Sequence, residues 1–229
     1  MLGILNHDEG LGCAATRFTG AIPMKTSPRR ALIVIDVQNE YVTGNLLIEH
    51  PPVNESLHNI GLAIDAARAS GIPVIVVQNA SAEGPLFARG STGWQLHEVV
   101  ATRKHDHRVE KSLPSAFPET DLQSYLQEQG VDTLTVIGYM TQNCDASTIV
   151  HALHMGLTVE FLHDASGTVS YRNEAGYVSA EDMHRVYCVV MHSRFAAVVS
   201  TAQWLHAVQQ SQALARSNIH ASHQAAMQR

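Results

Sequence analysis

The chain has 229 residues, of which 45% are hydrophobic and 16% are charged, and its formal net charge is −6. This length and apolar fraction suit one sizeable α/β domain with a buried core, and they exclude disorder over most of the chain. The negative charge, without a Lys/Arg stripe, argues against nucleic-acid binding. We also expect no membrane association, because no apolar run approaches the roughly 18–20 residues that cross a bilayer.

The N-terminal residues and the cysteine content bear on the cellular compartment. No basic segment followed by an apolar one precedes the first strand, so no signal peptide is visible. Cys13, Cys144 and Cys188 are few and odd in number, which is typical of a reducing environment. We therefore expect a cytoplasmic protein. Residues 1–30 have no apolar period and are predicted to be a flexible N-terminal extension.

From residue 31 the chain alternates between apolar, β-branched runs and segments whose apolar residues have helical spacing. Strands are predicted at 31–37, 72–78, 133–138, 157–164 and 195–200. Helices are predicted at 53–70, at 119–129, from 142–145 to 156, at 179–193 and at 201–210. Loops are predicted at 79–118 and 165–178.

Strands separated by helices of this length predict βαβ crossovers and a parallel sheet that is covered on both faces. The predicted fold is a single-domain, three-layer αβα sandwich of class α/β, with the ordered domain at 31–208. Residues 209–229 are rich in Gln, Ala, Ser and His, and we expect them to be a flexible C-terminal tail.

Three residues stand out as candidates for chemistry. Ligands of an open parallel sheet bind outside the carboxyl ends of its strands, and Asp36 and Cys144 both follow a predicted strand. The N–H groups and dipole at a helix N-terminus favour a thiolate, so we expect them to lower the pKa of Cys144. Lys111 lies in a long irregular stretch that a compact domain keeps only for a use. Each residue has an alternative that stays open: Asp36 could be a solvated strand end, Cys144 an inert cysteine and Lys111 a surface lysine.

The sequence contains 14 histidines, so a metal site has to be considered. Three pairs have spacings that could share a metal: His105 and His107, His151 and His154, His220 and His223. None of these pairs comes with a third ligand in the sequence, so we expect no metal and no other cofactor. Cys188 lies among Val and Met in a predicted helix and is expected to belong to the core.

The segments around the three candidate residues resemble the isochorismatase-like cysteine hydrolase family, which includes nicotinamidases and N-carbamoylsarcosine amidases. ALIVIDVQNEYVTG is similar to the first-strand motif, with Asp36 as its acid. VEKSLPSAFPETDL is similar to the central motif with Lys111, and VIGYMTQNCDASTIV to the segment with the nucleophile Cys144. The resemblance covers about residues 31–208 and implies a mainly parallel six-stranded sheet.

The resemblance also implies an activity. Cys144 would attack the carbonyl of a small amide, ureide or carbamoyl compound and form a thioester, with Asp36 as general base and Lys111 as the cation of the triad. A cis peptide bond before Met140 would let the backbone N–H groups of Met140 and Cys144 form the oxyanion hole. Vinyl-ether hydrolysis of the isochorismatase type and a non-catalytic binding protein stay open as alternatives.

Two departures from the family pattern concern the substrate. Nothing between Tyr41 and Gln78 matches the Asp-x-His with which nicotinamidases bind a metal. Asp145 follows the nucleophile where the family often has Val, and it could raise the pKa of Cys144 or reach a cationic substrate.

We expect the small-molecule pocket to be lined by residues of the loops around the sheet edge. They are Tyr41, Gln78, Phe87, Trp94, Phe117 and Tyr139. The resemblance implies a homo-oligomer, with Phe87 or Trp94 buried at or near a subunit contact. The alternative is that their loop folds over the chain's own active site as a lid.

Overall fold

The computed structural model describes residues 27–80 and 86–228. Six parallel strands form its main sheet in the order β3-β2-β1-β4-β5-β8. The strands are β1 (Arg30–Ile35), β2 (Val74–Asn79), β3 (His107–Lys111), β4 (Thr133–Tyr139), β5 (Thr158–Gly167) and β8 (Ala197–Val199). The predicted single α/β domain with a parallel six-stranded sheet is confirmed.

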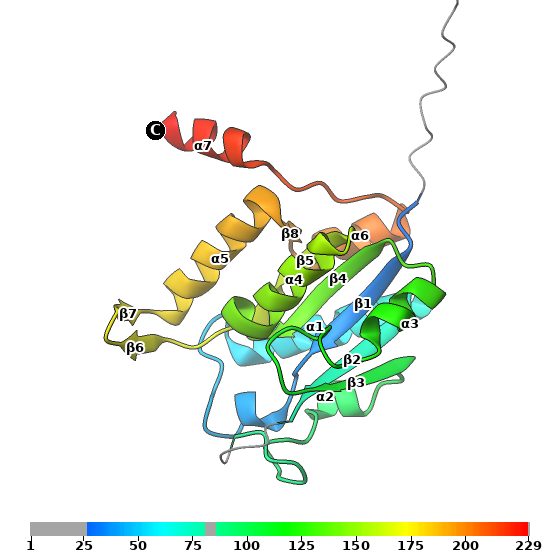
Figure 1. Cartoon of the computed structure of the whole chain (residues 1–229), viewed down its shortest axis with the longest axis vertical. Coiled ribbons are helices and arrows are strands. Elements are labelled where there is room, and N and C mark those ends of the chain that lie inside the picture. The colour runs from blue at the N-terminus through cyan, green and yellow to red at the C-terminus, as the bar shows by residue number, and fades with distance from the viewer. Residues whose placement is uncertain (1–26, 81–85, 229) are drawn as a thin grey trace, which may run out of the picture.

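Helices cover both faces of this sheet (Figure 1). They are α1 (Val53–Ala69), α2 (Glu98–Ala101), α3 (Leu122–Glu128), α4 (Ala146–His154), α5 (Ala180–Arg194), α6 (Thr201–Gln209) and α7 (Ile219–Met227), with the short turns η1 (Asn39–Tyr41) and η2 (Thr141–Asp145). The sheet separates two core layers. Alternate residues of β1 contribute to each layer, because successive side chains of a strand point to opposite faces. Leu32 and Val34 pack with α1 and α6, whereas Ile33 and Ile35 pack with α3, α4 and α5.

The predicted loops at 79–118 and 165–178 contain elements that the hydrophobic pattern did not reveal. β3 is an edge strand whose two buried residues are Val109 and Lys111, so its alternation includes a single apolar side chain. β6 (Tyr171–Asn173) and β7 (Gly176–Val178) form an antiparallel hairpin that projects from the body (Figure 1). This hairpin buries too little apolar surface to leave a period-2 signal.

The domain starts close to the predicted residue, whereas the C-terminal end contains a helix that was not predicted. β1 begins at Arg30, one residue before the predicted domain start, and the predicted extension lies mostly outside the described residues. The expected flexible tail at 209–229 contains the helix α7, which begins after an Asn218 side chain that accepts a hydrogen bond from the Ala221 N–H. No helix in the described part of the chain has the length and apolarity that a bilayer span requires.

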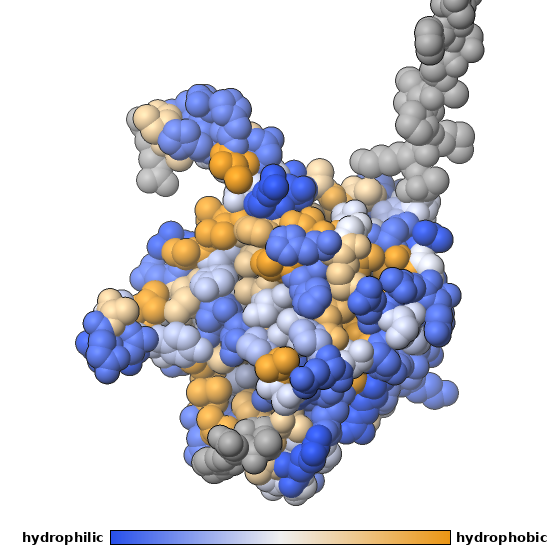
Figure 2. All heavy atoms as spheres, viewed as in Figure 1, coloured by the Kyte–Doolittle hydropathy of each residue, from blue (hydrophilic) through white to orange (hydrophobic). Residues whose placement is uncertain are grey.

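The outer face of α5 carries exposed apolar side chains. Val186, Val189 and Val190 are exposed there, and Figure 2 shows apolar surface along this helix on the side toward α7. None of the residues of α7 is buried, so this helix adds nothing to the two core layers. The part of the fold that positions the strand ends is therefore complete at α6.

A close backbone contact sets the spacing of the two central strands. Gly138 in β4 pairs with Ile35 in β1, at the last position before both strands reach the sheet edge. Gly138 has a φ of 121°, and a Cβ atom there would lie 2.0 Å from the Ile35 carbonyl oxygen. Only glycine permits both this conformation and this approach.

We predict that Gly138→Ala lowers the free energy of unfolding by about 3 kcal/mol or more, because the methyl group meets backbone rather than a movable side chain. Gly71→Ala is the matched control, since Gly71 also has a positive φ, 68°, but open space around its Cβ position. The control should lose about 1 kcal/mol, the cost of the left-handed conformation alone. Equal losses in urea denaturation of the two variants would contradict the steric argument.

Candidate active site

Three side chains from different elements meet at the carboxyl edge of the sheet. Asp36 follows β1, Lys111 ends β3, and Cys144 lies in η2, directly after β4. The Lys111 Nζ atom lies 2.8 Å from Asp36 Oδ2 and 3.3 Å from Cys144 Sγ. Both charged side chains are completely buried. The structure therefore brings the three sequence candidates together, and Lys111 is not a surface lysine.

The charges of Asp36 and Lys111 depend on each other. Burial raises the pKa of Asp36, and the Lys111 ammonium group partly offsets that rise. Burial alone would lower the pKa of Lys111, but the negative charge of Asp36, with the hydrogen bonds to Asp36 and Cys144, outweighs it, so the pKa of Lys111 is raised. At neutral pH the arrangement favours an ammonium group between a carboxylate and a thiol.

Asp36 adopts an unusual backbone conformation, with a φ of 51°. Asp is one of the few residue types that occupy this left-handed region with some frequency. Its N–H donates to the Val77 carbonyl at 3.0 Å, and its own carbonyl accepts from the Gln38 N–H at 2.8 Å. The chain thus turns sharply at Asp36 while its carboxylate stays fixed on the Lys111 side.

The Cys144 thiol is buried, with 5% of the residue exposed, and this corrects the prediction that the helix N-terminus lowers its pKa. Desolvation raises the pKa of Cys144, and the nearby charge of Asp36 raises it further, whereas Lys111 lowers it. The resting sulfur is therefore a neutral thiol beside a potential base.

Cys144 lies in a π-helical turn, η2, which spans five residues and leads directly into α4. Such turns contain one residue more than an α-helical turn and occur frequently at functional sites. The peptide bond between Tyr139 and Met140, just before this turn, is cis, as the family resemblance implies. The turn thereby presents the backbone of Met140 and the side chain of Cys144 at the same edge of the sheet.

Asp145, the residue after Cys144, is completely buried. Burial raises its pKa well above the ordinary value, and the negative charge of Asp36 raises it further. Lys111 offsets only part of this rise. The pKa of Asp145 is thus raised on balance, which disfavours a second negative charge next to the thiol.

Several expected pocket residues belong to the interior around the site. Tyr41 packs on Phe87 with ring centroids 5.1 Å apart and on Tyr139 at 5.5 Å, and all three residues are buried. The Tyr139 hydroxyl lies 2.7 Å from Ser56 Oγ in α1, so its polar atom is already occupied. Phe87 is thus buried within the chain itself, which favours the alternative that its loop covers the chain's own site.

Gln78 and Trp94 help to fix that loop. Gln78 Nε2 donates to the Trp94 carbonyl oxygen at 2.6 Å, and Gln38 Nε2 donates to the same oxygen at 2.7 Å. Gln78 Oε1 accepts from the Arg108 guanidinium group, so both ends of its amide are occupied. These contacts assign Gln78 a structural task. The half-buried Trp94 keeps a buried indole N–H that donates to no atom of the described residues.

The structure adds two polar contacts to the nucleophile turn that the sequence did not predict. Thr141 Oγ1 lies 2.9 Å from Nδ1 of the buried His184 in α5. Burial, then the neighbouring His50 and His163, lower the pKa of His184 to about 4, so its ring is neutral at pH 7. Gln142 contacts Tyr171 of the hairpin. The signal that could have indicated the contact between Thr141 and His184 was a histidine in the otherwise apolar buried stripe of α5.

The remaining histidines and Phe117 have other surroundings. His151 Nδ1 lies 3.2 Å from Ser115 Oγ, and its ring packs on Phe117 at 4.8 Å. His107 lies 2.9 Å from Asp121 in an exposed pair. Across residues 27–80 and 86–228, no three His, Cys, Asp or Glu side chains are grouped so that they could hold a metal ion.

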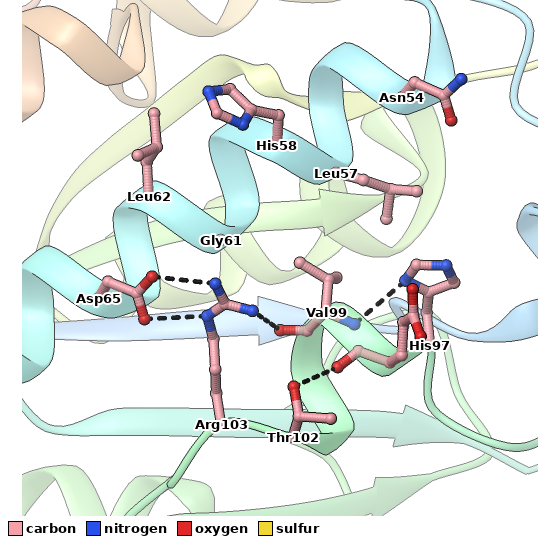
Figure 3. A pocket seen from close by; sticks show the side chains of 11 residues that line it. Asn54, Leu57, His58, Gly61, Leu62, Asp65, His97, Val99, Thr102 and Arg103 are labelled. Carbon is pink, nitrogen blue, oxygen red and sulfur yellow. Dashed lines mark hydrogen bonds and ion pairs between the residues drawn. The ribbon is translucent and has the colours of Figure 1, made fainter.

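A separate groove of about 470 Å³ lies between α1 and α2, away from the three candidate residues (Figure 3). The groove is lined by Arg103, whose guanidinium group donates to both carboxylate oxygens of Asp65 at 2.9 Å and to the Val99 carbonyl. The charge of Arg103 is therefore already neutralised by Asp65. His97, at its rim, accepts from the Val99 N–H. The Arg103–Asp65 pair connects α1 to the segment that follows α2.

Comparison with known proteins agrees with this fold. Residues 30–203 match the isochorismatase domain. A crystal structure from Burkholderia xenovorans LB400, named for isochorismatase, is 65% identical with a TM-score of 0.87, over 88% of this chain and 98% of that one. The isochorismatase family protein YddQ of Bacillus subtilis is 31% identical, over 76% of this chain and 98% of YddQ. The ureidoacrylate amidohydrolase RutB of Acinetobacter baylyi is 28% identical, over 82% and 86%. The chain belongs to the isochorismatase family.

Proposed function

We propose that this family member is a cysteine hydrolase that cleaves a C–N bond in a small amide, ureide or carbamoyl compound. The observation that carries the proposal is the position of Lys111 Nζ, 2.8 Å from Asp36 and 3.3 Å from the Cys144 sulfur in a buried site. A scaffold without chemistry gains nothing from such a set, since burying charged groups is costly. Similarity to a ureidoacrylate amidohydrolase supports the same reaction class.

The mechanism begins from the neutral thiol. As the Cys144 sulfur attacks the carbonyl carbon, its proton passes to Asp36, because the raised thiol pKa disfavours a preformed thiolate. The backbone N–H groups of Met140 and Cys144 would stabilise the oxyanion. The tetrahedral adduct then releases the amine, which takes the proton from Asp36, and leaves a thioester.

Water completes the reaction. Asp36 accepts a proton from the attacking water, and the thioester carbon gains the hydroxyl group. As the C–S bond breaks, Asp36 returns that proton to the sulfur, which restores the thiol and the carboxylate. Lys111 keeps its charge throughout and holds Asp36 ionised between the two steps.

Tyr41 and Trp94 stay candidates for substrate contact, and a homo-oligomer stays a prediction. Vinyl-ether hydrolysis is the second candidate, but it requires no thiol.

We predict that Cys144→Ala lowers ammonia release from a panel of small amides, ureides and carbamoyl compounds at least about 1,000-fold, because the covalent route is lost. Cys188→Ala is the matched control and should keep the wild-type rate, since Cys188 lies in α5, outside the three-residue set. A Cys144→Ala variant with more than a small residual rate would reject covalent catalysis by this residue.

We predict that Lys111→Met lowers kcat/KM at least about 100-fold, because Asp36 loses the charge that keeps it ionised. The pKa of Asp36 then rises further, so the acid limb of the pH–rate profile moves to higher pH. The profile should be measured between pH 5 and 9. Wild-type rates with a wild-type profile would show that Lys111 has no part in the reaction.

The same variant makes a prediction for stability. At pH 8, Lys111→Met should cost about 3 kcal/mol of unfolding free energy, because it leaves a buried carboxylate without its partner. Since the folded-state pKa of Asp36 lies above its ordinary 3.8, the folded variant binds more protons and its stability falls as pH rises. Asp36→Asn combined with Lys111→Met should recover the stability at pH 8 without recovering activity.

We also predict that hydrolysis needs no metal. Activity should survive dialysis against EDTA, because the three chemical groups of the proposed mechanism all come from side chains. Zinc and iron should then be added back singly. A loss of activity that either metal restores would contradict the prediction.

A further inference from the structure

A single hydrogen bond connects the nucleophile turn to the projecting hairpin. Gln142 Nε2 donates to the Tyr171 hydroxyl oxygen at 2.8 Å. Gln142 belongs to η2, two residues before Cys144, and Tyr171 is the first residue of β6. We propose that Tyr171 is a positioning residue for hydrolysis, which acts through Gln142 on the turn that carries Cys144. This inference rests on the proposed function.

The Gln142 amide is held from three directions. Its Oε1 accepts a hydrogen bond from Thr168 Oγ1, which follows the end of β5. Its Nε2 lies 3.7 Å from Met140 Sδ and also donates to Tyr171. Because Met140 and Cys144 lie on either side of Gln142 in the chain, this amide connects the residues of the proposed oxyanion hole with the body and with the hairpin.

Tyr171 can act there without belonging to the buried core. The residue is 37% exposed, whereas Thr168 is buried and Gln142 is half-buried. The Tyr171 hydroxyl reaches Gln142 from the hairpin, so its contact with the turn does not depend on burial of the ring.

The hairpin has few other attachments to the body. All three residues of β6 are exposed, and its base is held by Ser170, whose hydroxyl contacts Glu49 at 2.5 Å and accepts from the Ala180 N–H. Loss of the Tyr171 hydroxyl therefore frees one end of the Gln142 amide and leaves its Thr168 contact. Since a neutral hydrogen bond is lost, the expected effect on kcat is about threefold to tenfold.

The test compares Tyr171→Phe with Tyr177→Phe. Tyr177 lies in the same hairpin, is 58% exposed, and packs on the Arg172 guanidinium group at 4.6 Å; its hydroxyl makes no hydrogen bond within the described residues. We expect Tyr171→Phe to lower kcat about threefold to tenfold with a smaller change in KM, and Tyr177→Phe to leave both unchanged. Gln142→Met combined with Tyr171→Phe should lose no more than Gln142→Met alone.

A second measurement needs no substrate. Amide hydrogen exchange in the peptide that spans 139–146 should be faster in Tyr171→Phe than in the wild type, and unchanged in Tyr177→Phe. Wild-type kcat and wild-type exchange in Tyr171→Phe would overturn the inference. A rise in KM alone, with unchanged exchange, would also overturn it in favour of a direct substrate contact. If the wild type hydrolyses no compound of the panel, the proposed function fails and the exchange experiment alone decides whether Tyr171 orders the turn.

Discussion

The buried ion pair between Asp36 and Lys111 is the constraint on which the rest of the site depends. Each charge would be strongly unfavourable alone in a completely buried position, so the fold has to hold both side chains within contact distance. Asp36 comes from the centre of the sheet and Lys111 from its edge, with β2 between them. The sheet order therefore becomes a chemical requirement, and the close packing of Gly138 on Ile35 fixes the strand ends at which the pair forms.

The same pair explains why a buried, neutral thiol is compatible with nucleophilic catalysis. A preformed thiolate would place a second negative charge beside Asp36 without water to stabilise it. A thiol that gives up its proton during attack avoids that charge, provided that the neighbouring base is already ionised. Asp145 fits this scheme because its raised pKa disfavours a further negative charge beside one cation and one anion.

The sequence could predict five strands of the sheet and the common edge of Asp36 and Cys144, because apolar runs end there in polar residues. Lys111 was identified by its irregular loop and by the family resemblance, not by an apolar run. The sequence could not predict β3, since an edge strand that buries Lys111 in place of an apolar residue lacks the alternating pattern. The prediction of a lowered pKa for Cys144 was wrong for a related reason. The position of a residue at a helix start is visible in a sequence, whereas its desolvation depends on tertiary packing. Tyr171 and His184 were missed because each acts through contacts with residues distant along the chain.

The π-helical turn at 141–145 has a consequence for how this chain can vary over evolution. An α-helix advances about 100° per residue, so removing one residue from the turn would rotate Cys144 by roughly that angle away from Lys111. The length of the turn cannot change without separating the Cys144 sulfur from Lys111. Insertions and deletions among homologues should therefore collect in segments such as the β6–β7 hairpin tip and spare these five positions.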